Sequence, residues 1–445
     1  MGMRILSSEY IVVGSGPGGA TVARELAAQG KKVILFEQGI DYRKKPYYGT
    51  YLGPLIYCDR GSLLFTREGL NIVRPLMVGG ATSMYCGCAA HPPEWLKTKY
   101  KISLAGPVKE TIRELGLGEL PENLRGRAST RIADAARALG YDWQPVMKFM
   151  NPARSRGFGC TSSCMLGCRC GAKWNAGEYV DQAVTGGAEL HTRACVEQVL
   201  LEGSRAVGVT GRIAGKPFVA LAPVVILAAG GIGTPRILQK SGFRDAGVGM
   251  TMDTTVMVYG FGKEEGIGKE PPMTWYAENH EDGYMLSTLI DPWLLFPMIM
   301  ALKGARYPLY WPWWNRVLGI MIKLKDEISG GVFPDGSISK PFSKKEGERT
   351  ARAVEVAKGI LLKAGADSSR IFVTPQRGTH PSGTVRIDTM LDRNLQTEKQ
   401  GLYVCDASVF PEALCRPTVL TIIGFAKRLA KHLTKPAHGE SLSRE

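Results

Sequence analysis

The chain has little histidine and little cysteine, with six and ten residues of each type among 445. It also lacks a long hydrophobic run. The longest uncharged one near the middle, residues 292–302, has about half of the ~20 residues that a membrane-spanning helix needs. The first residues lead directly into a strand pattern, without the basic region, apolar stretch and small-residue cleavage site of a secretory signal. We therefore expect a cytoplasmic protein, in which clustered cysteines are more typical of metal or catalytic sites than of disulfides.

The overall composition is that of an ordinary globular protein, because 44% of the residues are hydrophobic and 22% are charged. The length suggests two or three domain-sized units. A net charge of +15 favours an anionic partner or simply contributes to solubility. No nucleic-acid-binding motif accompanies this charge, so we expect no nucleic acid among the partners.

A strand, a glycine cluster, a helix and a second strand follow one another near the N-terminus. The first strand is expected over 10–13, the helix over 21–28 and the second strand over 32–36. In the G-x-G-x-x-G pattern, the glycines permit a tight turn, close approach of a pyrophosphate, and close helix–strand packing. The helix N-terminus then favours phosphate. The glycines that fit this spacing are Gly14, Gly16 and Gly19.

Glu37 stands at the end of the second strand, where a carboxylate can accept hydrogen bonds from ribose hydroxyls. An acid at this position argues against NADP and leaves NAD and FAD open. Two later segments, 223–238 and 401–412, have the pattern of further strands of the same sheet. The dinucleotide-binding domain is therefore expected to be discontinuous in sequence.

Four stretches of the chain resemble the glucose–methanol–choline (GMC) oxidoreductase family and occur in the family's order. The resemblance identifies a short member with a cysteine-rich loop. It implies an α/β fold, with a discontinuous Rossmann-like FAD-binding domain and an α+β substrate-binding domain. It also implies FAD rather than NAD. The stretches are "GSGPGGATVARELA", "RPLMVGGATSMYCG", "VVILAAGGIGTPRILQKSG" and the C-terminal "GTHPSGTVRID" with "GLYVCDASVFPEALCRPTVLTIIGFAKRLAKHL".

The resemblance also suggests how the chain is divided. The FAD-binding domain is expected in three parts, with an insertion, a substrate-binding domain and a disordered tail between or after them. The expected bounds are 1–100, 185–250 and 375–435 for the FAD-binding domain, 101–184 for the insertion with its cysteine-rich loop 159–174, 251–374 for the substrate-binding domain and 436–445 for the tail.

The cofactor contacts are likewise implied by the resemblance. Some family members attach FAD through a histidine, and Met84 stands at that position here, so we expect non-covalent FAD. The expected cofactor-binding residues are Gly14, Gly16, Gly19 and Glu37 for the ADP part, Gly79, Gly80 and Thr82 beside the isoalloxazine, and Val196, Gly230, Asp406 and Pro417 along the rest of the cofactor.

The family motif H-P-x-G-T matches residues 380–384, which makes His380 the candidate catalytic base. Imidazole titrates near neutrality and can accept a hydroxyl proton as hydride leaves the carbon. The family usually places a second histidine or asparagine some thirty-five residues later, where this chain has Arg416 before Pro417. Arginine stays protonated, so Arg416 would stabilise an alkoxide, hold an anionic substrate group or stabilise the reduced cofactor.

Four of the ten cysteines fall within "GCTSSCMLGCRCGAKW", in the spacing C-x3-C-x3-C-x-C. Such a loop lets several sulfurs converge on one centre. It also resembles the cysteine loop of GMC-like dehydrogenases that carry an iron–sulfur cluster. Three cysteine ligands would suit a [3Fe-4S] cluster, and four would suit a [4Fe-4S] cluster. A structural zinc site and free or redox-active thiols are the alternatives that the sequence leaves open. The candidate ligands are Cys160, Cys164 and Cys168, with Cys170 as a fourth.

The resemblance therefore predicts an FAD-dependent dehydrogenase. It would oxidise a hydroxyl substrate, for which an apolar or lipid-like compound is a candidate, and pass electrons through the cluster to an external protein or quinone acceptor. The alternatives are a flavin-dependent reductase or desaturase of a lipid or isoprenoid, a non-catalytic electron-transfer subunit, and a scaffold protein with a zinc-stapled loop.

Residues 284–325 mix tryptophans with basic residues, a composition that suits a lipid headgroup interface. Four prolines divide the segment into short pieces. One interpretation is a membrane-resting surface that admits a lipid-like alcohol, which would place the protein peripherally at the membrane. The other is the wall of an apolar substrate pocket, or an oligomer interface.

Overall fold

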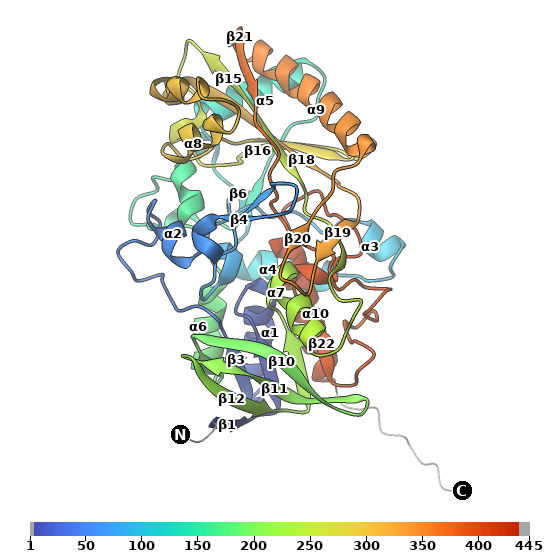
Figure 1. Ribbon diagram of the computed structural model, residues 1–445. Helices are drawn as coiled ribbons and strands as arrows, with labels where there is room; N and C mark the ends of the chain where they lie inside the picture. Colours follow the sequence, from blue (N-terminus) through green and yellow to red (C-terminus); the bar gives the residue numbers. More distant parts are fainter. Residues whose placement is uncertain (1–3, 436–445) are drawn as a thin grey trace, which may run out of the picture.

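The computed structural model describes residues 4–435, so the predicted disordered tail 436–445 lies outside the described residues. A parallel sheet forms the centre of the lower unit in Figure 1. Apart from the edge strand of Glu189–His191, its strands are short runs rich in buried valine, isoleucine and leucine, as expected where helices or a second sheet cover both faces. In sheet order they are β22 (Leu402–Val404), β13 (Val224–Leu227), β2 (Tyr10–Val13), β3 (Val33–Phe36) and β9 (Glu189–His191).

Helices cover one face of this sheet and a four-stranded sheet covers the other. The helices are α1 (Pro17–Ala27), which packs between α6 (Gly177–Thr185) and α10 (Val419–Leu433), and α4 (Ala105–Leu115), which packs on α10. The four-stranded sheet has the order β1 (Arg4–Ser7), β12 (Lys216–Leu221), β11 (Arg205–Ile213) and β10 (Ala194–Glu202), with α7 (Gly230–Lys240) against β10.

The upper unit in Figure 1 is a six-stranded antiparallel sheet with helices on one face. Successive side chains of β15 point to opposite faces of this sheet. Val256 and Val258 lie on the helix side, whereas Met257 lies on the other side, where it lines a large cavity. The strands are β21 (Ala366–Val373), β15 (Thr255–Gly262), β18 (Val317–Leu324), β17 (Tyr284–Thr288), β16 (Trp275–Asn279) and β7 (Gln144–Pro145), and the helices are α9 (Lys344–Lys363) and α5 (Arg127–Ala138).

Further short elements lie between the two units or at their edges. They are the helices α2 (Gly53–Tyr57), α3 (Trp95–Thr98) and α8 (Leu295–Ala301), the 3-10 helices η2 (Gly80–Ser83), η5 (Ser162–Leu166) and η7 (Tyr307–Arg316), and the strands β4 (Leu64–Phe65), β5 (Asn71–Ile72), β6 (Gly118–Glu119), β8 (Met147–Lys148), β14 (Val248–Met250), β19 (Ser329–Val332) and β20 (Ile338–Ser339). Within residues 4–435 no helix is both long enough and apolar enough to span a bilayer.

The prediction of an α/β fold, with a Rossmann-like unit assembled from distant segments, is confirmed. The segment 101–184 contributes to both units, because α4 and α6 pack on the parallel-sheet side while α5 and β7 join the six-stranded sheet. The two units meet at the carboxyl ends of the parallel strands, which is where open α/β sheets bind ligands.

Candidate active site

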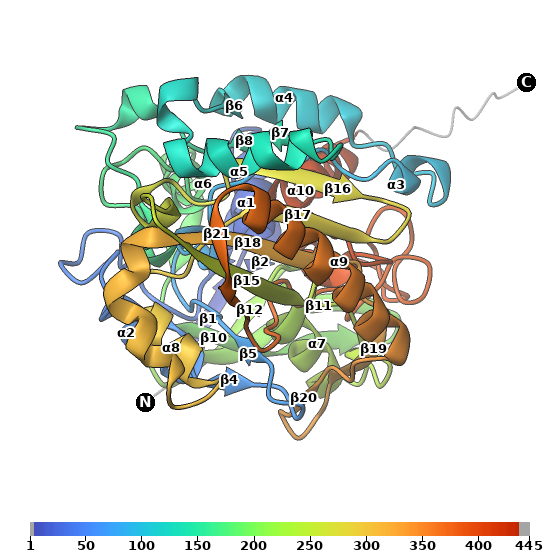
Figure 2. The ribbon, with the colours of Figure 1, turned by 90° about the horizontal axis from the view of Figure 1, so that it is seen from above.

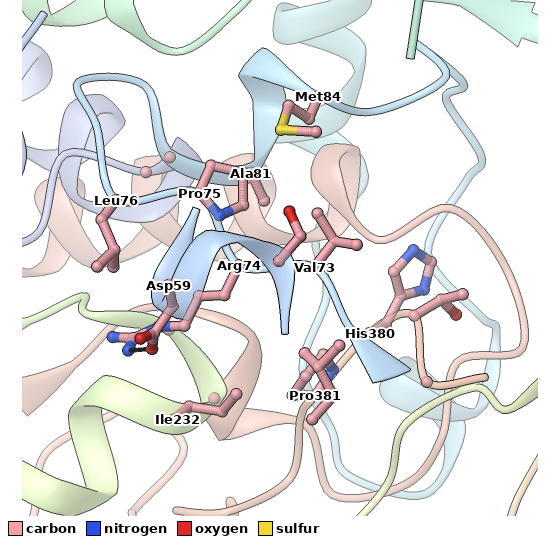
Figure 3. Close-up of a pocket in the computed structure, with 18 of the residues that line it drawn as sticks. Asp59, Val73, Arg74, Pro75, Leu76, Ala81, Met84, Ile232, His380 and Pro381 are labelled. Carbon is pink, nitrogen blue, oxygen red and sulfur yellow. Dashed lines mark hydrogen bonds and ion pairs between the residues drawn. The ribbon is translucent and has the colours of Figure 1, made fainter. Parts of the chain in front are cut away.

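A cavity of about 1610 Å³ lies between the carboxyl end of the parallel sheet and the inner face of the six-stranded sheet. Ligand pockets usually measure roughly 300–1,000 Å³, so this cavity has room for a dinucleotide and a further substrate. Figure 3 shows the imidazole of His380 in the same pocket as Met84 and Ala81. The predicted site residues that line it are Gly14, Gly16, Glu37, Gly80, Thr82, Val196, Gly230, His380, Asp406 and Pro417.

The glycine turn before α1 is closed on one side and open on the other. A Cβ atom on Gly14 would lie 2.3 Å from the Ala228 carbonyl oxygen, and one on Gly19 would lie 1.9 Å from the Gly14 oxygen. A Cβ atom on Gly16, by contrast, would meet nothing within 4 Å. Gly16 therefore borders free cavity space at the N-terminus of an eleven-residue helix, which fits a pyrophosphate.

Glu37 follows β3, and its carboxylate is held in place by three hydrogen bonds. Its carboxylate accepts hydrogen bonds from the backbone N–H of Ser15 at 3.1 Å, the Ser15 hydroxyl at 2.6 Å and the Gly39 N–H at 2.8 Å. Burial raises the pKa of Glu37, and these hydrogen bonds oppose that rise. The side chain lines the cavity, so its oxygens border the space that a bound ribose would take.

Asp406 and Gly230 form the second turn against the cavity. The Asp406 carboxylate accepts from the Gly230 N–H at 2.8 Å and from the Thr234 hydroxyl at 2.5 Å, which joins the end of β22 to the start of α7. Burial raises the pKa of Asp406. Gly230 has φ +79°, and a Cβ atom there would meet nothing within 4 Å, so this turn also leaves room for a ligand.

The segment around η2 lies against the glycine turn. A Cβ atom on Gly80 would lie 3.0 Å from Gly16 Cα, and Thr82 holds the segment by donating to the Gly79 oxygen at 2.5 Å. Gly79 and Gly19 do not themselves line the cavity and lie behind the residues that do. The side chain of Met84 lines the cavity. A thioether cannot serve as the nucleophile that a covalent bond to FAD would need, so Met84 fits non-covalent FAD.

His380 is held by a buried carboxylate. Its Nδ1 lies 2.9 Å from Asp253 Oδ2, and the other Asp253 oxygen accepts from the Cys415 N–H at 3.0 Å. A carboxylate only accepts, so Nδ1 carries the hydrogen and Nε2 is left to accept a proton. Burial and the charge of Lys323 lower the pKa of His380, and Asp253 opposes this. The imidazole is therefore neutral near pH 7.

Arg416 is turned away from His380. Its Nη2 donates to Glu278 at 2.6 Å and its Nη1 to the His91 oxygen at 3.0 Å. The side chain lines a separate, smaller depression with Glu278 and His280, whereas the next residue, Pro417, lines the main cavity. The structure therefore does not bring Arg416 to His380, because its guanidinium pairs with Glu278 outside the cavity.

Several polar residues at the site were not predicted from the sequence. Lys323, of the six-stranded unit, and Arg74 line the cavity, whereas Asp253 lies behind His380 and does not line it. Arg74 pairs with Asp59 at 2.8 Å (Figure 3). For Lys323 a signal was present in the sequence: a basic residue interrupts the apolar run of β18. Arg74 brings a guanidinium near Glu37, where it opposes the rise in the pKa of that carboxyl.

The four clustered cysteines converge around η5. The sulfur–sulfur distances are 3.9 Å for Cys160–Cys170, 4.0 Å for Cys160–Cys164 and 3.7 Å for Cys168–Cys170. In the described part of the chain no group of three or more histidine, cysteine or acidic side chains is arranged as a finished metal site. The neighbouring Cys164 thiol and burial raise the pKa of Cys168, so a cation would be needed to keep these groups as thiolates.

The comparisons with known proteins agree on one family. The GMC oxidoreductase description matches residues 61–257 and 343–426, and a Rossmann-like NAD(P)-binding description matches 12–42. An uncharacterized protein of Methanocaldococcus jannaschii is 27% identical, over 96% of this chain and 99% of its own length. A long-chain-alcohol oxidase of Arabidopsis thaliana is 23% identical, over 93% of this chain and 65% of its own length.

Solved structures share the fold at low sequence identity. Pyridoxine 4-oxidase from Mesorbium loti matches with a TM-score of 0.71 at 15% identity, over 97% of this chain and all of that one. A formate oxidase variant from Aspergillus oryzae matches with a TM-score of 0.73 at 12% identity, over 97% and 98% of the two chains.

The variant Gly16→Val tests whether the open glycine turn holds FAD. The new side chain meets no protein atom at its Cβ but fills cavity space, so the fold should persist while FAD binding weakens. Overpacking typically costs ~1–3 kcal/mol, or about 5–150-fold in affinity. Flavin absorbance per protein and the thermal midpoint of the apoprotein measure the two effects. Gly106→Val, in α4 and equally free of contacts, is the control. Full FAD content in Gly16→Val would contradict the assignment.

Proposed function

The chain belongs to the GMC oxidoreductase family, and on that premise we propose that it is an FAD-dependent enzyme oxidising the hydroxyl group of an apolar substrate. One observation carries the proposal: His380, held by Asp253, lines the same cavity as the open glycine turn. Oxidation of an alcohol removes a proton from the hydroxyl group and a hydride from its carbon. The base and the bound dinucleotide must therefore reach the same substrate, which requires that they share one cavity.

The residues of this chain would have separate roles in that reaction. The glycine turn, Glu37 and Asp406 hold the cofactor. His380 accepts the hydroxyl proton at Nε2, while Asp253 keeps the imidazole in the required tautomer and orientation. When bound, FAD supplies the acceptor for the hydride that leaves the carbon.

An apolar rim around the cavity mouth supports an apolar substrate. Six leucine, methionine and phenylalanine side chains both line the cavity and are exposed to solvent, with exposed fractions between 38% and 69%. They come from α2, α8 and the adjoining segments, which lie side by side in Figure 2; the Tyr51 hydroxyl accepts a hydrogen bond from the Leu294 N–H across them. The rim consists of Leu55, Leu63, Phe65, Leu294, Met298 and Leu302.

We further propose that this rim rests on an anionic lipid surface, from which a long-chain alcohol enters the cavity. Single exposed apolar residues are ordinary, but a contiguous group around a pocket mouth is typical of an interaction site. Arg60 lines the same cavity, Lys303 follows Leu302 directly and Arg306 comes three residues later, so positive charge borders the rim. The long-chain-alcohol oxidases among the relatives are consistent with such a substrate.

The cysteine loop is the proposed route for electrons. Met165 and Leu166 of this loop line the cavity, so the loop that carries the four thiols contributes to the cavity wall. We propose that they hold an iron–sulfur cluster, which accepts electrons singly and passes them to an external protein or quinone acceptor. The backbone N–H of Lys173 already donates to the Cys168 sulfur at 3.3 Å, a contact that favours a thiolate ligand.

Replacement of His380 tests the hydroxyl oxidation. His380→Gln should retain FAD and lower kcat for 1-dodecanol about 10²–10⁴-fold, the usual contribution of a general base. Stopped-flow bleaching of the flavin absorbance by substrate measures this step directly. His280→Gln is the matched control, since that histidine is exposed and lies outside the cavity. An undiminished rate in His380→Gln would refute the assignment and favour a carrier without a substrate of its own.

Analysis of iron, zinc and acid-labile sulfide in anaerobically purified protein tests the relay. About three to four irons per chain with matching sulfide are expected, and Cys164→Ser should lose them while Cys195→Ser keeps them. Dye reduction should then fall in Cys164→Ser although substrate still bleaches the flavin. One zinc per chain, or no metal, would refute the relay and leave direct reaction with oxygen, as in the oxidases among the relatives.

Vesicle sedimentation tests the lipid surface. Wild-type protein should bind phosphatidylglycerol vesicles, and the double variant Met298→Asp/Leu302→Asp should bind at least about tenfold more weakly, because each buried apolar side chain contributes ~1.5–3 kcal/mol. Leu362→Asp, an exposed leucine near the end of α9, is the control. Equal binding by the rim variant and the control would contradict the proposal.

A further inference from the structure

Lys323 is a buried cation whose hydrogen-bonding capacity is largely unused. It lies on β18 between β15 and β17, opposite Thr255 and Met285, and only 3% of the residue is exposed. An ammonium has three donors, yet among the described residues Nζ finds one partner, the Thr379 hydroxyl at 2.8 Å, and no carboxylate. Burying a charge without such partners is strongly unfavourable, so another group is expected to complete the site.

The other deeply buried lysines show what a satisfied site looks like in this fold. Lys427 reaches the carboxylates of three glutamates, and Lys148 reaches three backbone oxygens and a sulfur. Lys173 donates to two carbonyl oxygens, and Lys340 has a carbonyl and a hydroxyl with two carboxylates nearby. Lys323 differs from all four in that it also lines the cavity.

Lys323 and His380 border the same part of that cavity. Thr379 precedes His380 and accepts from Lys323, while its own hydroxyl donates to the Asp253 carbonyl oxygen at 2.8 Å. The Thr379 hydroxyl thus cannot satisfy Lys323 further. The remaining donors of Nζ are available where a substrate oxygen would meet Nε2 of His380.

We propose that the Lys323 ammonium binds the substrate oxygen whose proton His380 accepts, and stabilises the negative charge that develops on that oxygen. The O–H proton moves to Nε2 of His380, the C–H bond breaks with its electron pair leaving as hydride to FAD, and a carbonyl C=O bond forms. Lys323 remains protonated throughout. The inference rests on the proposed function and gives Lys323 the place in the site that Arg416 was expected to take.

The charged and titratable groups around Lys323 are consistent with a cationic lysine. Asp253 faces it from the segment before β15, and Asp326 follows β18, where burial raises the pKa of Asp326 to about 6. Cys86 and Cys415 are the other near groups, and burial raises the pKa of both thiols, so both are neutral. Burial lowers the pKa of Lys323 itself, which the two carboxylates oppose.

The pH profile gives a readout that a purely structural lysine would not change. The reaction needs neutral His380, and the positive charge of Lys323 lowers the pKa of that imidazole, so activity should persist as pH falls through 6.5. Removing the charge raises the pKa of His380 and moves the acidic limb of kcat/KM to higher pH. Asp253 raises the pKa of His380, so Asp253→Asn should lower that pKa and move the acidic limb of kcat/KM to lower pH.

The decisive variant is Lys323→Met in FAD-loaded protein, assayed with 1-dodecanol and a dye acceptor. Methionine suits the apolar strand, so the thermal midpoint should stay or rise while kcat falls about 10²–10³-fold, as for other groups that stabilise a developing oxyanion. Histidine NMR titration reports the pKa of His380 without turnover. Lys325→Met is the matched control. It removes the same charge two residues away, but Lys325 lies outside the cavity, where it pairs with Glu412 at 2.9 Å.

Lys323→Ala provides a second variant, in which ethylammonium should restore part of kcat. The inference is overturned if Lys323→Met keeps kcat within about twofold with an unchanged acidic limb, or if it unfolds and Lys323→Ala shows no amine rescue. If His380→Gln is also fully active, the proposed function fails as well. If His380→Gln is inactive and Lys323→Met is normal, only the role of Lys323 fails.

Discussion

Direct contact of backbone on backbone at the carboxyl end of the parallel sheet is the constraint on which the site depends. A Cβ atom on Gly18 would lie 1.8 Å from the Cys405 oxygen, and one on Gly231 would lie 2.0 Å from the Pro381 oxygen. No side chain fits between these segments, so α1 meets the end of β22 and α7 meets the segment that carries His380. The same closeness that excludes side chains brings the glycine turn and His380 to one cavity.

Buried carboxylates complete what the glycines begin. Glu37 and Asp406 each stand at the end of a parallel strand and accept from the N–H groups of a neighbouring turn, while Asp253 bridges His380 and the backbone of Cys415. Each carboxylate is desolvated and would be unstable there without these donors. The three carboxylates therefore fix loops whose backbones border the cavity. Of the three, only Asp253 also orients a side chain that can accept a proton, the imidazole of His380.

The parts of this site that sequence predicted are those set by local spacing. The glycine turn, Glu37 and His380 follow from short motifs whose geometry is nearly independent of the rest of the chain. Lys323 and Asp253 do not, because their approach to His380 requires the register of β15 against β18 and the packing of that sheet over the parallel one. Arg416 lies away from His380 for a local reason that its spacing does not reveal: Cys415 adopts φ +58°, and the guanidinium that follows pairs with Glu278.

The cavity mouth and the cysteine loop are physically connected. The Tyr57 hydroxyl at the end of α2 donates to the Leu166 oxygen at 2.8 Å, and Gly167 packs against the backbone of Gly49, ahead of α2. Ordering of the loop by a bound centre would therefore also steady one side of the apolar rim. In the proposed function, substrate entry and electron exit would therefore depend on one packed segment, so a cysteine variant is expected to affect KM as well as dye reduction. Flavin bleaching in a single turnover at saturating substrate separates the two effects, since it requires entry and His380 but no onward transfer.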